Sequence, residues 1–140
     1  MEINFWMVLV AAVANFVIGF LFHGPLFGKT WMRLANVTPT GNEKLSDMVP
    51  QMSKNLLANI VFAYALAVFH LYAVTSTLST GPSTAWNGMA CGFLVWLGFV
   101  VTSSSMEVIW MKRSTKLWLF EMVASLVSIL AMGAIIGASM

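Results

Sequence analysis

Residues 55–106 read NLLANIVFAYALAVFHLYAVTSTLSTGPSTAWNGMACGFLVWLGFVVTSSSM, and this stretch contains no Lys, Arg, Asp or Glu. One transmembrane helix needs about 20 apolar residues to cross a hydrocarbon core roughly 30 Å thick, so the stretch is long enough for two crossings. The segment STGPST at residues 79–84 interrupts it. Gly-Pro flanked by hydroxyl residues is typical of a turn, and Ser83 or Thr84 can cap the following helix. We therefore predict two transmembrane helices joined by a short turn.

Two more charge-free stretches, residues 3–28 and 122–140, lie on either side of the central one. The first differs from a secretory signal peptide because Glu2 precedes it, no cation leads it and no small-x-small cleavage site follows, so we expect a retained span. The alternating segments of about ten residues that membrane β-barrels need are missing. The sequence thus predicts an all-α bundle of four transmembrane helices in a single membrane domain, residues 1–140. The spans are expected at residues 3–23, 55–78, 85–111 and 117–138.

The composition is that of a chain whose surface faces lipid. Hydrophobic residues make up 59% of it and charged residues only 9%, whereas soluble domains are about a quarter charged. The Lys and Arg residues are too few, and too confined to two loops, for a nucleic-acid-binding face. We therefore expect the lipid bilayer as a partner, and no nucleic acid. Cys91 is the one cysteine, so it forms no intramolecular disulfide and is expected to be an inert buried thiol.

The positive charges predict the orientation. All seven Lys and Arg fall in two predicted loops, residues 24–54 and 112–116, whereas the termini and the turn at residues 79–84 have none. Because Lys and Arg accumulate in cytoplasmic loops, we expect both loops in the cytoplasm and both termini outside, in a multi-pass protein of the cell membrane. The cations are Lys29, Arg33, Lys44, Lys54, Lys112, Arg113 and Lys116.

The first loop begins with a segment that predicts a short amphipathic helix on the membrane surface. Pro25 suits a first helical position, and from there Phe27, Trp31 and Leu34 share one face. Basic residues on the opposite face would reach anionic headgroups. A short connector anchored by Trp31 is an equal alternative. The residues expected at the interface are Lys29, Trp31 and Arg33.

Two helix-start signals follow in the same loop. Thr40 and Glu43 have the spacing of a capping box, in which each side chain caps the backbone N–H of the other residue. Pro50 is expected in the first turn of a helix, where a proline is tolerated. The second transmembrane helix should therefore begin in the cytoplasm, before its apolar span.

The run GPLFGKTWM at residues 24–32 directly follows the first predicted span. It resembles the signature of a family of small bacterial membrane proteins known as domain of unknown function 1761, and the order of spans is similar over essentially the whole chain. The resemblance implies the four-span fold. It implies no activity and no catalytic residues. Phe22-His23 stands where that family often has Trp-Tyr, so no role of that pair carries over.

Polar residues inside the spans are the functional candidates, because burying them in lipid is costly. Glu107 lies five residues before Lys112, and Glu121 lies five residues after Lys116. At about 1.5 Å per residue, both carboxylates lie about 7 Å inside the cytoplasmic boundary. Residues at i, i+3, i+4 and i+7 spacings continue the same helix faces; these include Gly19, Ser104 and Ser128. The predicted polar layer, a candidate ion- or solute-binding site, comprises Glu107, Glu121, Asn59, His23, Asn15, Ser103 and Ser125.

This layer has two interpretations. The faces could line a wet vestibule reaching to mid-membrane, in which two converging carboxylates repel one another and exchange a proton or bind a cation. Alternatively, each carboxylate reaches the interface or pairs with Arg113 or Lys116, while each serine satisfies its own helix.

His70 is a poor partner for His23 in a metal site. His70 lies about 20 Å above the cytoplasmic boundary, near which His23 lies, and ligands of one metal must converge within a few ångströms. We expect His70 to bond between helices, and we expect neither a metal nor another cofactor. No nucleophile–base pair or metal constellation is recognisable, so no enzyme is expected.

Small residues leave a further alternative open. Gly88-x-x-x-Gly92 and Gly133-x-x-x-Gly137 permit close approach of helix backbones. They either pack the third and fourth spans within one subunit or join the subunits of a homo-oligomer. Because four helices leave little room for a pore, oligomerisation would build any conduction path.

Two functions follow. The first is a homo-oligomeric channel or transporter for a small ion or solute that uses the polar layer. The alternative is a non-transporting membrane module that binds lipid or partner transmembrane helices.

Overall fold

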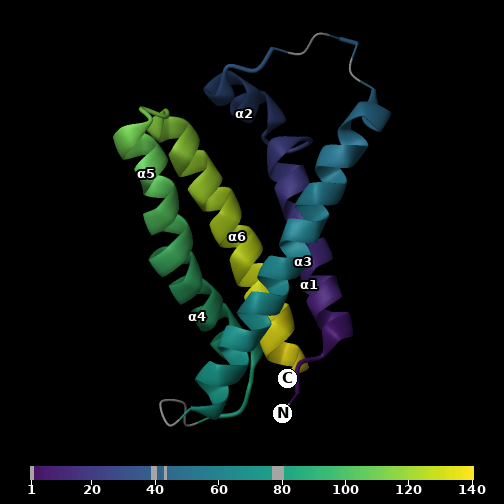
Figure 1. Cartoon of the computed structure of the whole chain (residues 1–140), viewed down its shortest axis with the longest axis vertical. Helices are drawn as coiled ribbons and strands as arrows, with labels where there is room; N and C mark the ends of the chain where they lie inside the picture. The colour runs from purple at the N-terminus through teal and green to yellow at the C-terminus, as the bar shows by residue number, and fades with distance from the viewer. Residues whose placement is uncertain (1, 39–40, 43, 77–80) are drawn as a thin grey trace.

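The computed structural model describes residues 2–38, 41–42, 44–76 and 81–140. Within these residues the chain forms helices and no strands, and four of the helices are long and apolar enough to cross a membrane. The predicted all-α, four-span fold is therefore confirmed (Figure 1). In chain order the elements are α1 Phe5–His23, α2 Gly28–Ala35, α3 Leu45–Thr75, α4 Ala85–Val95, the π-helix η1 Trp96–Val101, α5 Thr102–Trp110 and α6 Thr115–Ser139. The elements α4, η1 and α5 run on as one long helix, Ala85–Trp110.

Two helix starts differ from the prediction. The short helix α2 begins at Gly28 and not at Pro25. The backbone N–H of Leu26 bonds to the carbonyl of Leu21 in α1, and that of Gly28 bonds to the carbonyl of Gly24, which makes residues 24–27 a turn. Helix α3 begins at Leu45, which places Pro50 in its second turn and not its first. Asp47, in the first turn of α3, suits the positive end of the helix dipole. The predicted capping box of Thr40 and Glu43 lies outside the described residues.

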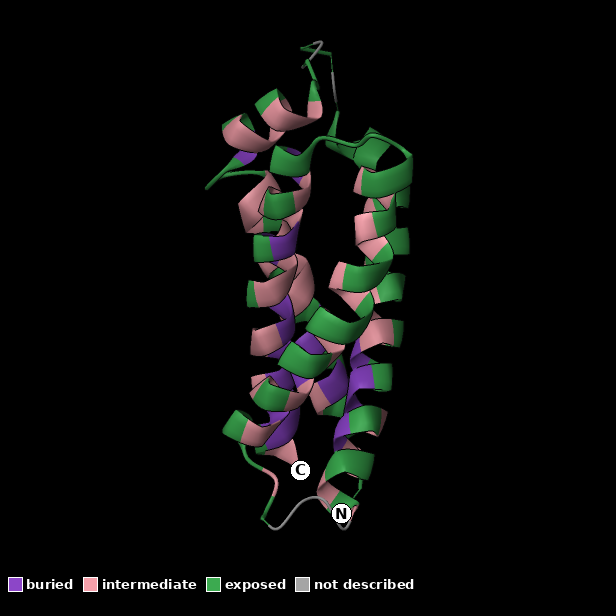
Figure 2. Cartoon of the chain, turned by 90° about the vertical axis from the view of Figure 1, so that its left-hand side faces the viewer, coloured by how far each residue is buried: buried purple, intermediate pink, exposed green. Residues whose placement is uncertain are grey.

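The core lies in the half of the bundle that contains the two termini. Small side chains dominate it on α1 and α3, and Figure 2 shows the buried residues gathered in that half. Toward the other end, α5 and α6 lean away from α1 and α3 (Figure 1). The helices therefore pack closely at one end and leave room between them at the other. The fully or nearly fully buried core residues are Val8, Ala11, Ala12, Ala63, Leu66, Ala67, Ile129, Met132 and Ile136.

The glycines make the closest contact between α4 and α6. Gly88, Gly92, Gly133 and Gly137 are all buried. A Cβ atom at Gly88 would overlap the backbone carbonyl of Gly133, and one at Gly133 would overlap the carbonyl of Gly88. The glycines thus pack two helices of one subunit, and the interpretation that they join subunits is wrong.

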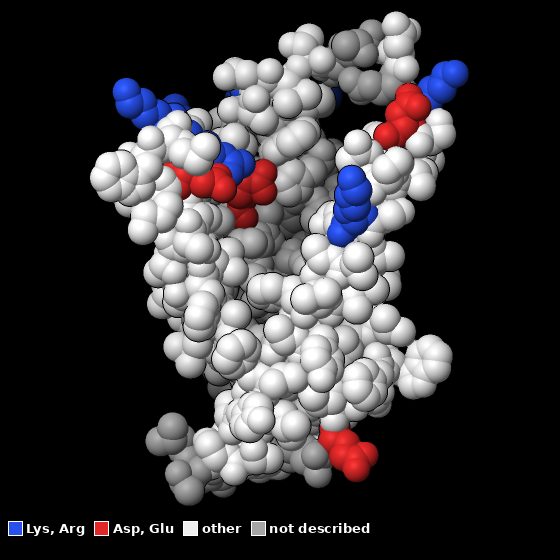
Figure 3. All heavy atoms as spheres, in the orientation of Figure 1, with Lys and Arg blue, Asp and Glu red and all other residues white. Residues whose placement is uncertain are grey.

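The two ends of the bundle differ in charge. Both termini lie at one end, here called the terminal end, and α2 and the α5–α6 turn lie at the other, the basic end (Figure 1). The Lys and Arg atoms visible in Figure 3 lie toward the basic end. The chain therefore separates its charges along the helix axes, as an oriented membrane protein does.

The orientation can be tested by moving the single cysteine. In a Cys91→Ser background, Ala138→Cys should react with a membrane-impermeant maleimide on intact cells, because the positive-inside rule puts the terminal end outside. Thr115→Cys should react only after the membrane is permeabilised. Both positions are exposed, and Thr115 spares Ser114, whose hydroxyl caps α6. The opposite labelling pattern would contradict the predicted orientation.

Candidate functional site

The last residue of α1 meets α6 in a bifurcated contact. Nε2 of His23 lies 3.0 and 2.9 Å from the two carboxylate oxygens of Glu121, and Nδ1 lies 2.8 Å from the carbonyl oxygen of Gly19. Since a carbonyl only accepts, Nδ1 donates there. One further proton then lies between Nε2 and Glu121, in either an imidazolium–carboxylate or an imidazole–carboxylic acid pair. The two side chains are 32% and 26% exposed.

Trp31 brings α2 to this pair. Its indole N–H donates to Oε1 of Glu121 at 3.1 Å, and its ring meets that of His23 edge-on, with centroids 5.4 Å apart. Phe120 also packs edge-on against the His23 ring, with centroids 5.8 Å apart. Glu121 thus forms hydrogen bonds to two different elements, α1 and α2. Asn36, in the left-handed conformation, ends α2.

The three residues predicted at the membrane interface therefore differ in their surroundings. Trp31 is half-buried with its indole N–H on Glu121, whereas Lys29 and Arg33 are exposed on α2. Contact of Lys29 and Arg33 with lipid headgroups stays a prediction. The role of Trp31 was missed because a tryptophan near a span end is typical of an interfacial anchor. Its place in the GPLFGKTWM run was the available signal.

A cavity of about 340 Å³ extends from this pair between α1, α3 and α6. Asn15 donates its side-chain amide to the side-chain oxygen of Asn59 at 2.9 Å, which links α1 to α3 at the cavity wall. Figure 3 shows the surface hollowed between α3 and the α5–α6 side. The polar lining residues are Asn15, His23, Asn55, Asn59, Glu121, Ser125 and Ser128, and the others are Phe16, Gly19, Phe20, Leu45, Met48, Met52 and Ala124.

The tertiary structure brings five of the seven predicted residues to this one cavity. They come from two of the polar faces expected from helical spacing, those on α1 and α6, together with Asn59 of α3, whereas the face of Glu107 on the third span does not reach this cavity. Ser125 also accepts a hydrogen bond from the indole of Trp96, the first residue of the π-helix, at 2.9 Å, and donates to the carbonyl of Met122. The π-helix therefore presents Trp96 to α6. The five residues are Asn15, His23, Asn59, Glu121 and Ser125.

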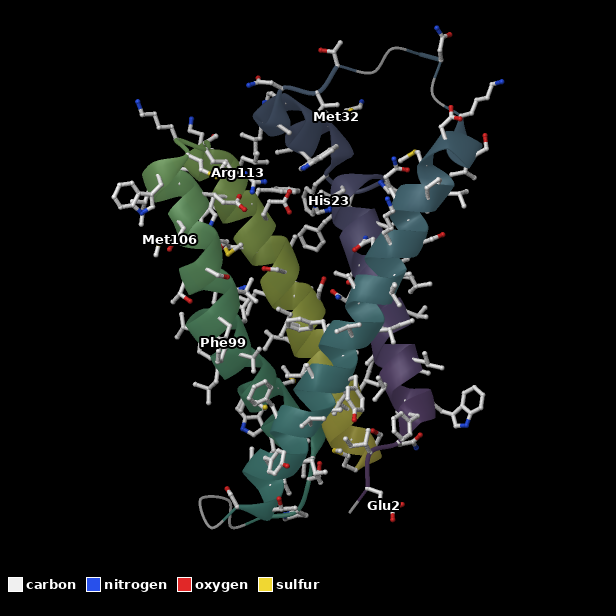
Figure 4. All side chains as sticks on the ribbon, in the orientation of Figure 1. Glu2, His23, Met32, Phe99, Met106 and Arg113 are labelled. Carbon is white, nitrogen blue, oxygen red and sulfur yellow. The ribbon has the colours of Figure 1, made fainter. Side chains whose placement is uncertain are left out.

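Glu107 and Ser103 lie elsewhere. Glu107 forms an ion pair with Arg113, across the turn that ends α5 (Figure 4 labels Arg113). With Ser103 it lines a separate cavity of about 500 Å³ beside Phe62 and Phe99. Ser103 donates its hydroxyl to a carbonyl of its own helix. Glu107 thus pairs with Arg113, one of the two bases named in the second interpretation, whereas Glu121 pairs with His23, which neither interpretation named as its partner.

The two histidines lie toward opposite ends of the bundle. His23 is at the basic end, while His70 bonds to Ser83 in the connection before α4, near the terminal end. In the described part of the chain, no three His, Cys, Asp or Glu side chains come close enough to hold a metal ion together. The site therefore consists of a protonatable pair and neutral amide and hydroxyl groups.

Four apolar helices with a polar site between them define an α-helical integral membrane protein with four spans. The chain belongs to the family described as "Protein of unknown function (DUF1761)", which matches residues 6–137. That match confirms the family resemblance seen in the GPLFGKTWM run. No curated protein and no solved structure matches the chain.

Proposed function

We propose that the protein transports a small cation, which competes with a proton at Glu121. The observation that carries this proposal is the convergence of ionisable and amide groups from α1, α3 and α6 on one cavity inside the spans. Ionisable groups within membrane spans are rare and mark ion or proton pathways. Among the described residues that line this cavity, Glu121 is the one carboxylate.

The chemistry of the lining supports exchange of one cation for one proton. A hard cation prefers oxygen ligands, and Glu121 supplies a carboxylate while Asn59 and Ser128 supply neutral oxygens. When the cation takes the place of the Nε2 proton, that proton leaves and His23 becomes neutral. One positive charge replaces another, so the charge of the site is unchanged by a monovalent cation.

The packing beyond the cavity favours a carrier over an open channel. Toward the terminal end, core residues follow the residues that line the cavity. On α1, Ala12 lies about one turn beyond Asn15, and on α6, Ile129 directly follows Ser128. Passage to the terminal end therefore requires the helices to repack. The proposed cycle alternates between this conformation, with its cavity near the basic end, and one with the cavity near the other end.

A flux measurement tests the proposal. Proteoliposomes with a trapped pH-sensitive dye should become alkaline inside when Na⁺ or K⁺ is added outside, because each entering cation expels a proton. Glu121→Gln should lower the initial rate at least about tenfold, since it removes the charge that both ions share. His23→Gln should uncouple cation movement from proton movement.

Glu107→Gln is the matched control. It removes a carboxylate from the same end of the bundle, but from the separate cavity next to Arg113, so the flux should stay unchanged. Proton movement no faster than in protein-free liposomes for both cations would overturn the proposal. So would equal rates for Glu121→Gln and the unmodified protein.

A module that binds lipid or partner helices is the second proposal. The observation in its favour is the exposure of the third span, Ala85–Trp110, of which only 6% of the most apolar window is buried. We propose that this face contacts lipid or a second copy in a homo-oligomer, and that the protein is not an enzyme. Native mass spectrometry from lipid nanodiscs distinguishes the two partners, because it counts subunits and retained lipids together.

A further inference from the structure

His70, in α3, is only 1% exposed and is held by a defined relay of hydrogen bonds. Its Nε2 lies 2.8 Å from the hydroxyl of Ser83, and that hydroxyl donates to the carbonyl of Gly137 at 2.7 Å. A serine hydroxyl has one hydrogen, and a carbonyl can only accept it. Nε2 must therefore donate to Ser83, which makes Nδ1 of the neutral ring a lone-pair acceptor.

That acceptor has no partner. Among the buried side-chain nitrogen and oxygen atoms that the structure describes, Nδ1 of His70 is the only one without a hydrogen bond. Buried polar atoms in native proteins are almost always paired, and each exception calls for an explanation. A bound molecule that donates one hydrogen bond would give Nδ1 of His70 the partner that it lacks.

A cavity of about 460 Å³ lies beside His70, between α3 and the third span. Its volume is in the range of pockets that take small organic molecules. The rings of Phe69 and Phe99, with centroids 6.2 Å apart, form part of its wall, and both side chains are exposed at the surface that faces lipid. A ligand can therefore enter sideways from the bilayer.

We propose that this cavity binds an apolar phenol from the bilayer. Its hydroxyl donates to Nδ1 of His70, which is buried in this structure, after the neighbouring atoms that cover this nitrogen have moved aside. The ring packs against Phe69 and Phe99, since aromatic rings gain from offset and edge-to-face contact. A ketone or an ether cannot donate to Nδ1, and a charged head would lose its hydration in this apolar place. The site lies toward the terminal end and is independent of cation exchange at Glu121.

A matched pair of ligands tests this assignment. 4-Hexylphenol and its methyl ether, 4-hexylanisole, differ in the hydroxyl hydrogen that the proposal requires. In nanodiscs holding protein labelled with ¹⁵N-histidine, the phenol should shift the Nδ1 resonance of His70 saturably, as expected for a nitrogen that accepts a hydrogen bond. The ether should bind at least about tenfold more weakly. The chain has two histidines, and a His23→Gln variant assigns their signals.

The site is checked with variants that keep the relay of hydrogen bonds. Ala90 is exposed and lines the cavity, so Ala90→Phe fills the space and should abolish the shift while the Nε2 signal of His70 stays in place. Ala58→Phe, at an exposed position of α3 outside this cavity, should leave binding unchanged. Equal responses to phenol and ether, no saturable shift, or full binding in Ala90→Phe would each overturn the proposal, whatever the flux experiment shows.

Discussion

Replacing Gly88 by alanine should lower the free energy of unfolding by about 1–3 kcal/mol, the usual cost of overpacking a close-packed contact. The new Cβ atom would overlap the backbone carbonyl of Gly133 and come within 2.9 Å of the Cα atom of Gly137. Neither atom belongs to a flexible side chain. The two helices must therefore move apart, and they would lose contact along the length over which α4 and α6 pack. The measurement is reversible unfolding in mixed micelles followed by circular dichroism.

Gly98 provides the matched control in the same span. Apart from its chain neighbours and its own helix backbone, no atom lies within 4 Å of a Cβ built at Gly98, and alanine favours helix over glycine by up to about 1 kcal/mol. Gly98→Ala should therefore be neutral or stabilising. If Gly88→Ala is as stable as the unmodified protein, the close contact between α4 and α6 is wrong.

A double change sharpens this test. Once Gly88→Ala has separated the helices, Gly133→Ala should cost less than it does alone, because the two substitutions act at one contact. The same reasoning applies to larger residues: leucine at Gly133 and Gly137 should unfold the subunit before it affects any assembly. An oligomer that dissociates into stable, folded monomers would contradict the intrasubunit role.

The second large effect is expected at His23 and Glu121. A double-mutant cycle of His23→Gln, Glu121→Gln and the double change should yield a coupling energy of about 1–3 kcal/mol in unfolding, a range typical of groups in one polar network. Each single change leaves the other side chain without its charged partner between the helices. Glutamine keeps the size of Glu121 and an acceptor for the indole of Trp31. At position 23 it removes the ring that packs against Trp31 and Phe120, but this loss occurs in both variants that carry His23→Gln and cancels from the coupling energy.

The Arg113–Glu107 pair is the control cycle. These side chains are 38% and 44% exposed, at the turn between α5 and α6. Ion pairs accessible to water contribute about 0–1 kcal/mol, so this coupling should be smaller and should weaken further in high salt. A larger coupling for Arg113–Glu107 than for His23–Glu121 would show that the cavity pair does not hold α1 to α6.

The sequence by itself determined the four spans and the separation of charge between the two ends. Those features depend on local properties: the length of charge-free stretches, one Gly-Pro turn and the distribution of Lys and Arg. Helical spacing also grouped Asn15 with His23 and Glu121 with Ser125. The spacing within a helix does not depend on what the helix packs against.

Only the tertiary structure decided which of these faces meet. Glu107 and Glu121 have the same distance from the basic loop in sequence, yet Glu121 bonds to His23 and Trp31 while Glu107 pairs with Arg113. The rotation of each helix about its axis determines these partners. That rotation follows from packing between helices, here from glycine against glycine on α4 and α6, and from side chains distant in the chain.

The tertiary structure also decided where two helices begin and which nitrogen of His70 stays unpaired. Pro25 and Pro50 are acceptable in a first turn by local rules, but backbone bonds among the neighbouring residues place Pro25 in a turn, and the early start of α3 places Pro50 one turn farther in. His70 was predicted to bond between helices, but its partner Ser83 lies in the connection before α4, and Nδ1 stays unpaired. That outcome depends on Ser83 and Gly137, which lie far along the chain and meet His70 only in the folded protein.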